Sequence, residues 1–285
     1  MIKVINCNKK NYLNILTKFL DLRRSGKKTE NKVISKILKD IKNNKNKSLL
    51  KYEKKFSKNS QIKPSVNEIN KSIKSLDPKI KRAIDFSYKR ILKFHTAQKT
   101  KDIFYIDNFK NKIEYKYIPI QSVGIYVPAN LPSTLLMNAI PAKIAGVKRI
   151  VLANPKNNGK LNPAVLYAAK KLGINEIYSM GGAQAIGSLA YIQKVNKIVG
   201  PGNIFVAGAK RQVFGDVGIE GMIAGPSEIT VLADSKTNLN EVTTSMIGQA
   251  EHDPNSQCIL ITKDLNLIKK FKKDLELKLK EISRK

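Results

Sequence analysis

From residue 120 onward, short apolar runs alternate with amphipathic segments of helical length, and this alternation is the strongest constraint on the fold. Strands are predicted for SVGIYVP, RIVLAN, EIYSM, KIVG, SEITVLAD and CILIT. Helices are predicted for the segments between them, from TLLMNAIPAKIAGV to LNEVTTSMIGQAEHD, and for the Lys-rich end of the chain. Strands that alternate with helices indicate a mostly parallel sheet covered on both faces, so the sequence predicts an α/β, Rossmann-like fold.

The first hundred residues follow a different pattern. Apolar residues recur at helical spacing in 11–24, 31–58 and 65–98, with a break expected at Asp77-Pro78 because proline fits the first turn of a new helix. IFYID and IEYKYIPI flank NFKNK and predict a β-hairpin. The predicted organisation is an N-terminal helical region (1–100), a Rossmann-like region (101–234) and the start of a second α/β unit (235–285).

The chain is strongly basic, with a formal net charge of +31. Residues 1–100 hold 28 Lys and Arg against 7 Asp and Glu, which is +21 of that total, and they are spread along helical patterns. Lys outnumbers Arg, and aromatic residues are not interleaved with the basic ones as a base-stacking surface requires. We therefore favour solvated helix faces and no nucleic-acid partner. A basic nucleic-acid-associated protein stays an alternative, and a steep salt dependence of DNA binding would identify it.

Cysteine usage and the N-terminus bear on the compartment. Cys7 and Cys258 lie far apart and form no CxxC pattern, which suits a reducing compartment. The N-terminus lacks the apolar core of a signal peptide, and no apolar stretch approaches the roughly 18 residues of a membrane span. We expect a cytoplasmic protein with no membrane partner.

Glycine-rich turns link several predicted strands to helices. YSMGGAQAIG passes through Gly181-Gly182, and KIVGPGNIFV passes through Gly200, Gly202 and Asn203. Backbone N–H groups at such helix N-termini can hold an anion such as a phosphate. The alternative is that glycine only permits tight turns and that Asn203 is a helix N-cap.

Two further segments carry candidate ligands. Ser227 in IAGPSEITV enters a strand from a loop, and a Ser in such a place is more often a turn residue than a ligand. Gln249 and His252 in IGQAEHD have the spacing that places two side chains on one helix face, and both types can coordinate a metal. The pair by itself is an incomplete zinc site, and a polar helix end in water is the alternative interpretation.

Six segments together resemble histidinol dehydrogenases. They are VGIYVP, LPSTLLMNAIPAKIAGV, IYSMGGAQAIGSLAY, KIVGPGNIFVAGAKRQVFG, MIAGPSEITVLAD and GQAEHDPNSQ, in the order and approximate spacing of that family. The resemblance implies a histidinol and aldehyde dehydrogenase-like fold, and a zinc-dependent, homodimeric cytoplasmic enzyme. Its implied reaction uses NAD to oxidise L-histidinol through the aldehyde to L-histidine, in histidine biosynthesis.

The resemblance also implies roles for individual residues. It assigns NAD binding to Tyr126, Gln184 and Asn203, and substrate contact to Ser227. It assigns both zinc and substrate to Gln249 and His252. Zinc would orient the amino alcohol as a Lewis acid while the nicotinamide receives hydride.

Two of the departures from the family pattern bear on the expected site. The loop after Pro128, ANLPST, is shorter than the family's loop. The family's Glu-His acid–base pair and two further zinc ligands belong to a later segment than Lys285, so no catalytic residue is assigned and this chain is expected not to turn over. It resembles the N-terminal two-thirds of the enzyme. A truncated homologue that binds NAD or another ligand without catalysis is the alternative.

Overall fold

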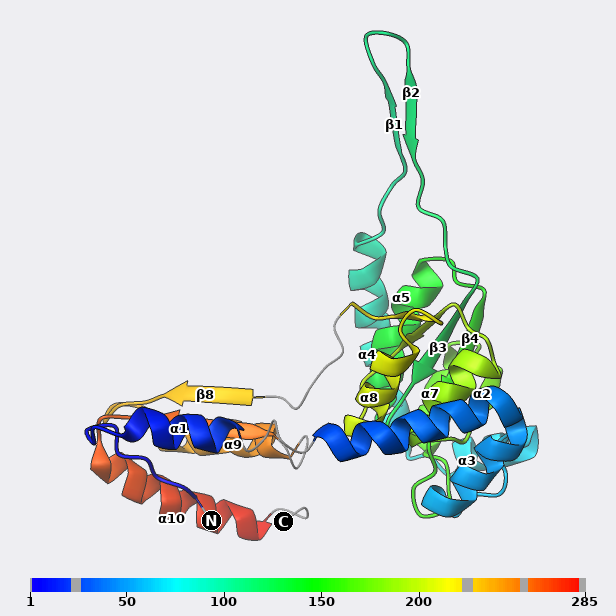
Figure 1. Ribbon diagram of the computed structural model, residues 1–285. Helices are drawn as coiled ribbons and strands as arrows, with labels where there is room; N and C mark the ends of the chain where they lie inside the picture. Colours follow the sequence, from blue (N-terminus) through cyan, green and yellow to red (C-terminus); the bar gives the residue numbers. More distant parts are fainter. Residues whose placement is uncertain (1, 22–26, 222–227, 252–255, 282–285) are drawn as a thin grey trace. The chain divides into compact units, whose positions relative to one another are not determined.

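The computed structural model describes residues 2–21, 27–221, 228–251 and 256–281. The chain forms two compact units, one of residues 30–223 and one that joins residues 1–29 to residues 224–285 (Figure 1). Each unit has its own hydrophobic core. Within the described residues, no helix combines the length and apolar character needed to cross a bilayer.

The larger unit is built on a five-stranded parallel sheet. Its strands are β3 (Ser122–Tyr126), β4 (Arg149–Ala153), β5 (Glu176–Tyr178), β6 (Lys197–Val199) and β7 (Gly218–Ile219). They lie in the order β5-β4-β3-β6-β7. This is the order of the first five strands of a Rossmann fold, and the chain reverses direction across the sheet between β3 and β6.

Helices cover both faces of this sheet. Their bounds are α2 (Lys27–Ser57), α3 (Val66–Lys74), α4 (Pro78–Ala97), α5 (Pro132–Ile144), α6 (Pro163–Lys171), α7 (Gly182–Tyr191) and α8 (Ile204–Val213). Helices α3 to α6 share one buried cluster with Ile125 and Leu152, whereas α2, α7 and α8 share another with Val151 and Ile198. The strands are buried from both sides, which explains their continuous apolar runs.

Capping residues set the helix boundaries as expected. Asp77 accepts a hydrogen bond from the backbone of Lys79 and Pro78 begins α4. Ser65 and Glu68 form a reciprocal capping box at the start of α3. The break predicted at Asp77-Pro78 is confirmed.

A β-hairpin joins the helices to the sheet. Strands β1 (Ile103–Ile106) and β2 (Lys112–Tyr115) pair antiparallel, as predicted, and extend away from the sheet of their unit (Figure 1). All eight residues of these two strands are exposed.

The smaller unit combines the two ends of the chain. It contains α1 (Tyr12–Asp21), β8 (Glu228–Leu232), α9 (Leu239–Ala250), β9 (Gln257–Ile261) and α10 (Leu265–Glu281). Strands β8 and β9 pair parallel with each other, and Val242, Met246 and Phe271 form the core between them and the helices.

The α/β, Rossmann-like fold predicted from the sequence is confirmed, but the compact units have different boundaries from the three expected regions. Helices α2 to α4 belong with the sheet because Ile34, Leu38, Ile73 and Ile84 lie in its cores. Strand β8, expected in the Rossmann-like region, pairs with β9 in the smaller unit. The short strand β7 was not expected, because two residues carry no periodic signal.

Candidate functional site

The carboxyl ends of β3 and β6 define the position where a ligand is expected. Open α/β sheets bind ligands in the crevice where the strand order reverses, and here β3 is the first strand and β6 its neighbour across that reversal. Tyr126 ends β3, and Gly200 follows the last residue of β6.

Gly200 is in close contact with the end of β3. It has a φ of +106°, and a Cβ atom added there would lie 2.0 Å from the Tyr126 carbonyl oxygen. The buried Lys210 of α8 holds the same turn, because its Nζ donates to the Gly200 carbonyl and pairs with Glu220. Glycine is therefore required here both for its conformation and for its lack of a side chain.

Asn154 fixes the loop that follows β3. This fully buried residue comes directly after β4, and its Nδ2 donates to the carbonyls of Val127 at 3.0 Å and Pro128 at 3.2 Å. The backbone N–H of Val127 also donates to the Ala153 carbonyl at 2.9 Å. The short loop after Pro128 is thus held to the neighbouring strand.

A buried carboxylate connects the glycine pair to Gln184. Glu53 of α2 is 1% exposed, and its Oε1 accepts from the Gly181 N–H at 2.8 Å and from Gln184 Nε2 at 2.9 Å. Tyr126 interacts with the backbone N–H of Gly182, and the charge of Glu53 acts on it. Tyr126, Gly181-Gly182, Gln184 and Glu53 therefore form one cluster at the carboxyl edge of the sheet.

Burial dominates the electrostatics of this cluster. Desolvation raises the pKa of Glu53, although hydrogen bonds from Gly181, Gln184, Ser57 and Asn59 oppose the shift. Burial, together with the Glu53 charge, raises the pKa of Tyr126 to about 12. The phenol therefore stays protonated at neutral pH, while ionisation of Glu53 lowers the stability of the fold.

The raised pKa of Glu53 predicts a pH-dependent effect of Glu53→Gln. A folded-state pKa above the ordinary 4.5 means that this group's contribution is fully present below pH 4.5 and is lost as pH rises through the folded pKa. Gln cannot ionise, so the free energy of unfolding of Glu53→Gln minus that of the wild type should increase as the pH rises from 4.5. Urea unfolding at a series of pH values measures it, and a constant difference would contradict the prediction.

Asn203 caps helix α8. Its Oδ1 accepts from the backbone N–H groups of Phe205 at 3.1 Å and Val206 at 3.2 Å, and its side chain is exposed. Asn203 is therefore a helix N-cap, which was one of the two interpretations of this turn. It leaves the amide nitrogen on the same side chain as a further donor.

The remaining candidate ligands belong to the smaller unit. Gln249 lies in the last turn of α9, and its buried Nε2 has no hydrogen-bond partner among the described residues. Ser227 and His252 lie outside the residues that the structure describes. In the described part of the chain, no group of three or more His, Cys, Asp or Glu side chains is arranged to hold a metal ion.

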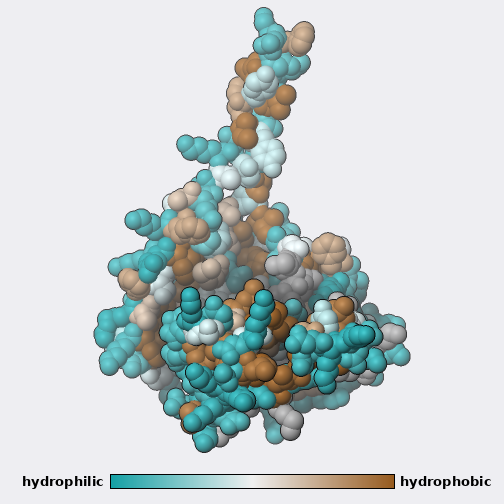
Figure 2. Space-filling view, turned by 90° about the vertical axis from the view of Figure 1, so that its left-hand side faces the viewer, coloured by the Kyte–Doolittle hydropathy of each residue, from teal (hydrophilic) through white to brown (hydrophobic). Residues whose placement is uncertain are grey.

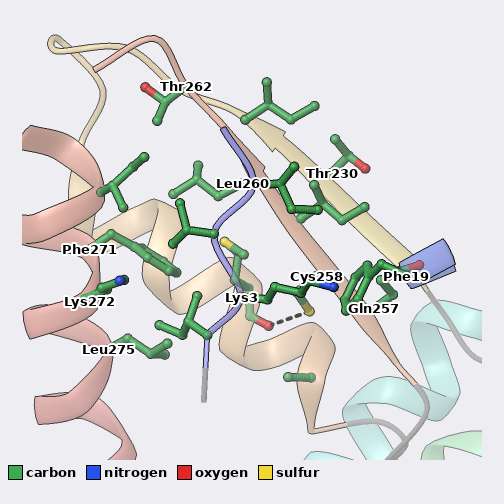
Figure 3. Close-up of a pocket in the computed structure, with 18 of the residues that line it drawn as sticks. Lys3, Phe19, Thr230, Gln257, Cys258, Leu260, Thr262, Phe271, Lys272 and Leu275 are labelled. Atoms are coloured by element: carbon green, nitrogen blue, oxygen red, sulfur yellow. Dashed lines mark hydrogen bonds between the residues drawn. The ribbon is translucent and has the colours of Figure 1, made fainter. Parts of the chain in front are cut away.

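The smaller unit also contains a cavity of about 1030 Å³ (Figure 3). Apolar side chains such as Phe19, Ile259 and Phe271 line much of it. Cys258 Sγ donates to the Met246 carbonyl at 3.2 Å, and burial raises the pKa of its thiol. A thiol held protonated in this way is a poor nucleophile, in keeping with the structural role expected for Cys258.

The sequence analysis did not single out three residues of the carboxyl edge. Glu53 lies in the Lys-rich helix α2, and Lys210 lies beside Arg211 near the end of α8, so both look like ordinary surface charges, although both are buried. Asn154 offers a weak signal, because a strand that ends in Asn often holds the next loop.

Comparisons with known proteins agree with this architecture. Residues 22–285 match the sequence profile of the family described as histidinol dehydrogenase. The histidinol dehydrogenase of Pelagibacter ubique is 54% identical over 100% of this chain and 68% of its own length. That of Agrobacterium fabrum is 42% identical over 93% of this chain and 64% of its own length.

A solved structure gives the same result in three dimensions. The crystal structure of histidinol dehydrogenase from Elizabethkingia anophelis superposes with a TM-score of 0.77 at 38% identity. The match covers 89% of this chain and 61% of that one, so the chain spans about two-thirds of its relatives. Since the match extends over nearly all of this chain in sequence and in fold, the chain belongs to the histidinol dehydrogenase family.

Proposed function

We propose that the protein takes part in the NAD-dependent oxidation of L-histidinol to L-histidine, in the last steps of histidine biosynthesis. The observation that carries this proposal is the cluster of Tyr126, Gly181-Gly182 and Gln184 at the carboxyl edge of a Rossmann-ordered sheet. Sequence resemblance assigns Tyr126 and Gln184 to NAD, and these two residues are 58 positions apart along the chain.

The residues at this edge suit a dinucleotide. The Gln184 amide, the exposed Asn203 side chain and the Tyr126 ring would bind and orient NAD. NAD supplies the hydride acceptor of the reaction. The Tyr126 hydroxyl stays protonated because its pKa is raised to about 12, so it can serve as a hydrogen-bond donor at neutral pH.

Zinc and the substrate would lie at Gln249, His252 and Ser227. Gln249 is the described member of this set: its amide oxygen can coordinate a metal, and its buried Nε2 has no hydrogen-bond partner among the described residues. Zinc would act as a Lewis acid toward the amino alcohol.

We also propose that the protein is cytoplasmic and works as a homodimer. The hairpin β1–β2 supports the dimer, because its side chains Phe104, Tyr105 and Phe109 are 59%, 56% and 87% exposed. Figure 2 shows hydrophobic residues at several places along the projecting part of the molecule. Isolated two-stranded hairpins are marginally stable in water, and contiguous exposed apolar side chains mark interaction surfaces. A partner surface would bury these side chains.

Calorimetric titration with NAD tests the proposed function. We expect the chain to bind NAD, and Gln184→Ala to weaken binding about tenfold through loss of a buried hydrogen-bonding group. Gln212→Ala removes the same type of side chain from an exposed position on α8 and should leave the affinity unchanged. Absence of NAD binding by a folded wild-type chain would reject the proposal.

A further inference from the structure

Glu53 is an unusual residue at the carboxyl edge, because it is a buried acid among neutral donors. Among the described residues, its carboxylate meets the Gly181 N–H, the Gln184 amide and the side chains of Ser57 and Asn59. Buried carboxylates are commonly paired with a cation, since neutral donors compensate less well for lost water. The cost of burying this charge therefore calls for a functional explanation.

Residues 59–62, which follow α2, hold Ser179 at the end of β5 through hydrogen bonds that do not involve Glu53. Asn59 Nδ2 donates to the Ser179 carbonyl at 2.7 Å, and Ser179 Oγ donates to the Gln61 carbonyl at 2.6 Å. The Ser179 N–H also donates to the Ile62 carbonyl at 2.6 Å. These contacts anchor the end of β5, so Glu53 is needed only for the groups further along, Gly181 and Gln184.

Glu53 also determines which way the Gln184 amide faces. Gln184 Nε2 donates to Glu53 Oε1 at 2.9 Å, so the NH₂ end of the amide faces this acceptor. Gln184 Oε1 lies 3.0 Å from the position that a Cβ on Gly182 would take, so the amide also packs against the glycine turn.

We propose that Glu53 is a positioning residue of the cofactor site, which fixes the Gln184 amide and the Gly181-Gly182 turn beside Tyr126. This inference rests on the proposed NAD-binding function. The raised pKa of Glu53 supports it, because ionisable groups that carry such a cost gather at functional sites. Glu53 is not itself assigned to NAD, and we expect it to act through Gln184, with which it shares a hydrogen bond.

Substitutions at Glu53 separate positioning from stability. Glu53→Ala leaves the Gly181 N–H and the Gln184 amide without their acceptor and should weaken NAD binding about tenfold. Glu53→Gln keeps an acceptor oxygen, and its NH₂ group can donate to Ser57, so its affinity should stay within about threefold of the wild type. Glu53→Leu removes the acceptor but preserves side-chain volume, and it replaces Glu53→Ala if that variant fails to fold.

Asp40 offers a matched control in α2, on the other side of the kink at Lys45 from Glu53. Its Oδ2 accepts from the Tyr52 hydroxyl at 2.5 Å, so Asp40→Ala and Asp40→Asn repeat the same chemical changes without touching the turn. Both should bind NAD like the wild type. Backbone hydrogen exchange supplies a second measurement. The Gly181 amide should exchange faster than in the wild type in Glu53→Ala or Glu53→Leu, and its exchange rate should be unchanged in Asp40→Ala.

The outcomes distinguish the two proposals. Wild-type NAD affinity together with unchanged Gly181 exchange in a folded Glu53→Ala or Glu53→Leu protein overturns the role of Glu53 alone. Equal loss of NAD affinity in the Asp40 variants also overturns it, because the effect would then be a general disturbance of α2. If the wild-type chain binds no NAD, the proposed function fails and the cofactor role of Glu53 falls with it.

Discussion

Gly200→Ala should lower the free energy of unfolding by at least about 3 kcal/mol, since it combines backbone strain with a steric clash. The residue has a φ of +106°, which an L side chain rarely adopts. The new Cβ would also lie 2.0 Å from the Tyr126 carbonyl oxygen and 3.1 Å from its carbonyl carbon. Both neighbours are backbone atoms of a strand buried in the sheet, so neither can move without disturbing the hydrogen bonds of that strand.

Gly215 provides the control for this experiment. Its φ is +100°, but nothing lies within 4 Å of the position that a Cβ would occupy. Gly215→Ala therefore carries the backbone strain without the clash and should cost about 1–2 kcal/mol. Urea unfolding of both variants measures the difference. Equal losses would show that the end of β6 does not approach β3 as closely as described.

Lys210→Ala should cost about 3 kcal/mol of unfolding free energy, the scale for breaking a buried ion pair. The Lys210 side chain is 2% exposed, and its ammonium contacts both the Gly200 carbonyl and the Glu220 carboxylate. Removing it leaves the carboxylate, which is 27% exposed, without its cation and the Gly200 carbonyl without its donor. Lys210→Met retains most of the packing volume, so a similar loss in that variant would assign the effect to charge.

Lys42 supplies the matched lysine on the surface. It pairs with Asp216 at 3.1 Å, but the two side chains are 56% and 46% exposed. Lys42→Ala should cost no more than about 1 kcal/mol, because water screens such pairs. Thermal or urea unfolding compares the two variants, and a Lys210→Ala protein as stable as Lys42→Ala would contradict the buried pairing.

The local elements could be predicted because their causes are local. The strands and helices from β3 to α8 follow the hydrophobic period of the sequence, and Asp77-Pro78 marks a helix start through its own side chains. Two residues assigned to NAD from sequence motifs, Tyr126 and Gln184, meet in one cluster. Their roles in binding NAD stay predictions, as do the roles of Asn203, Ser227, Gln249 and His252.

The sequence by itself determined the fold class, the family and the segments that carry the motifs, because periodicity and motif order are properties of consecutive residues. Only the tertiary structure decided that β8 pairs with β9, that Lys210 is buried, and that Glu53 contacts Gly181 across 128 positions of the chain. In a Lys-rich helix a buried charge and a solvated one have the same local pattern. Their difference arises from residues distant in sequence that remove the water around them, and no short stretch of sequence records that.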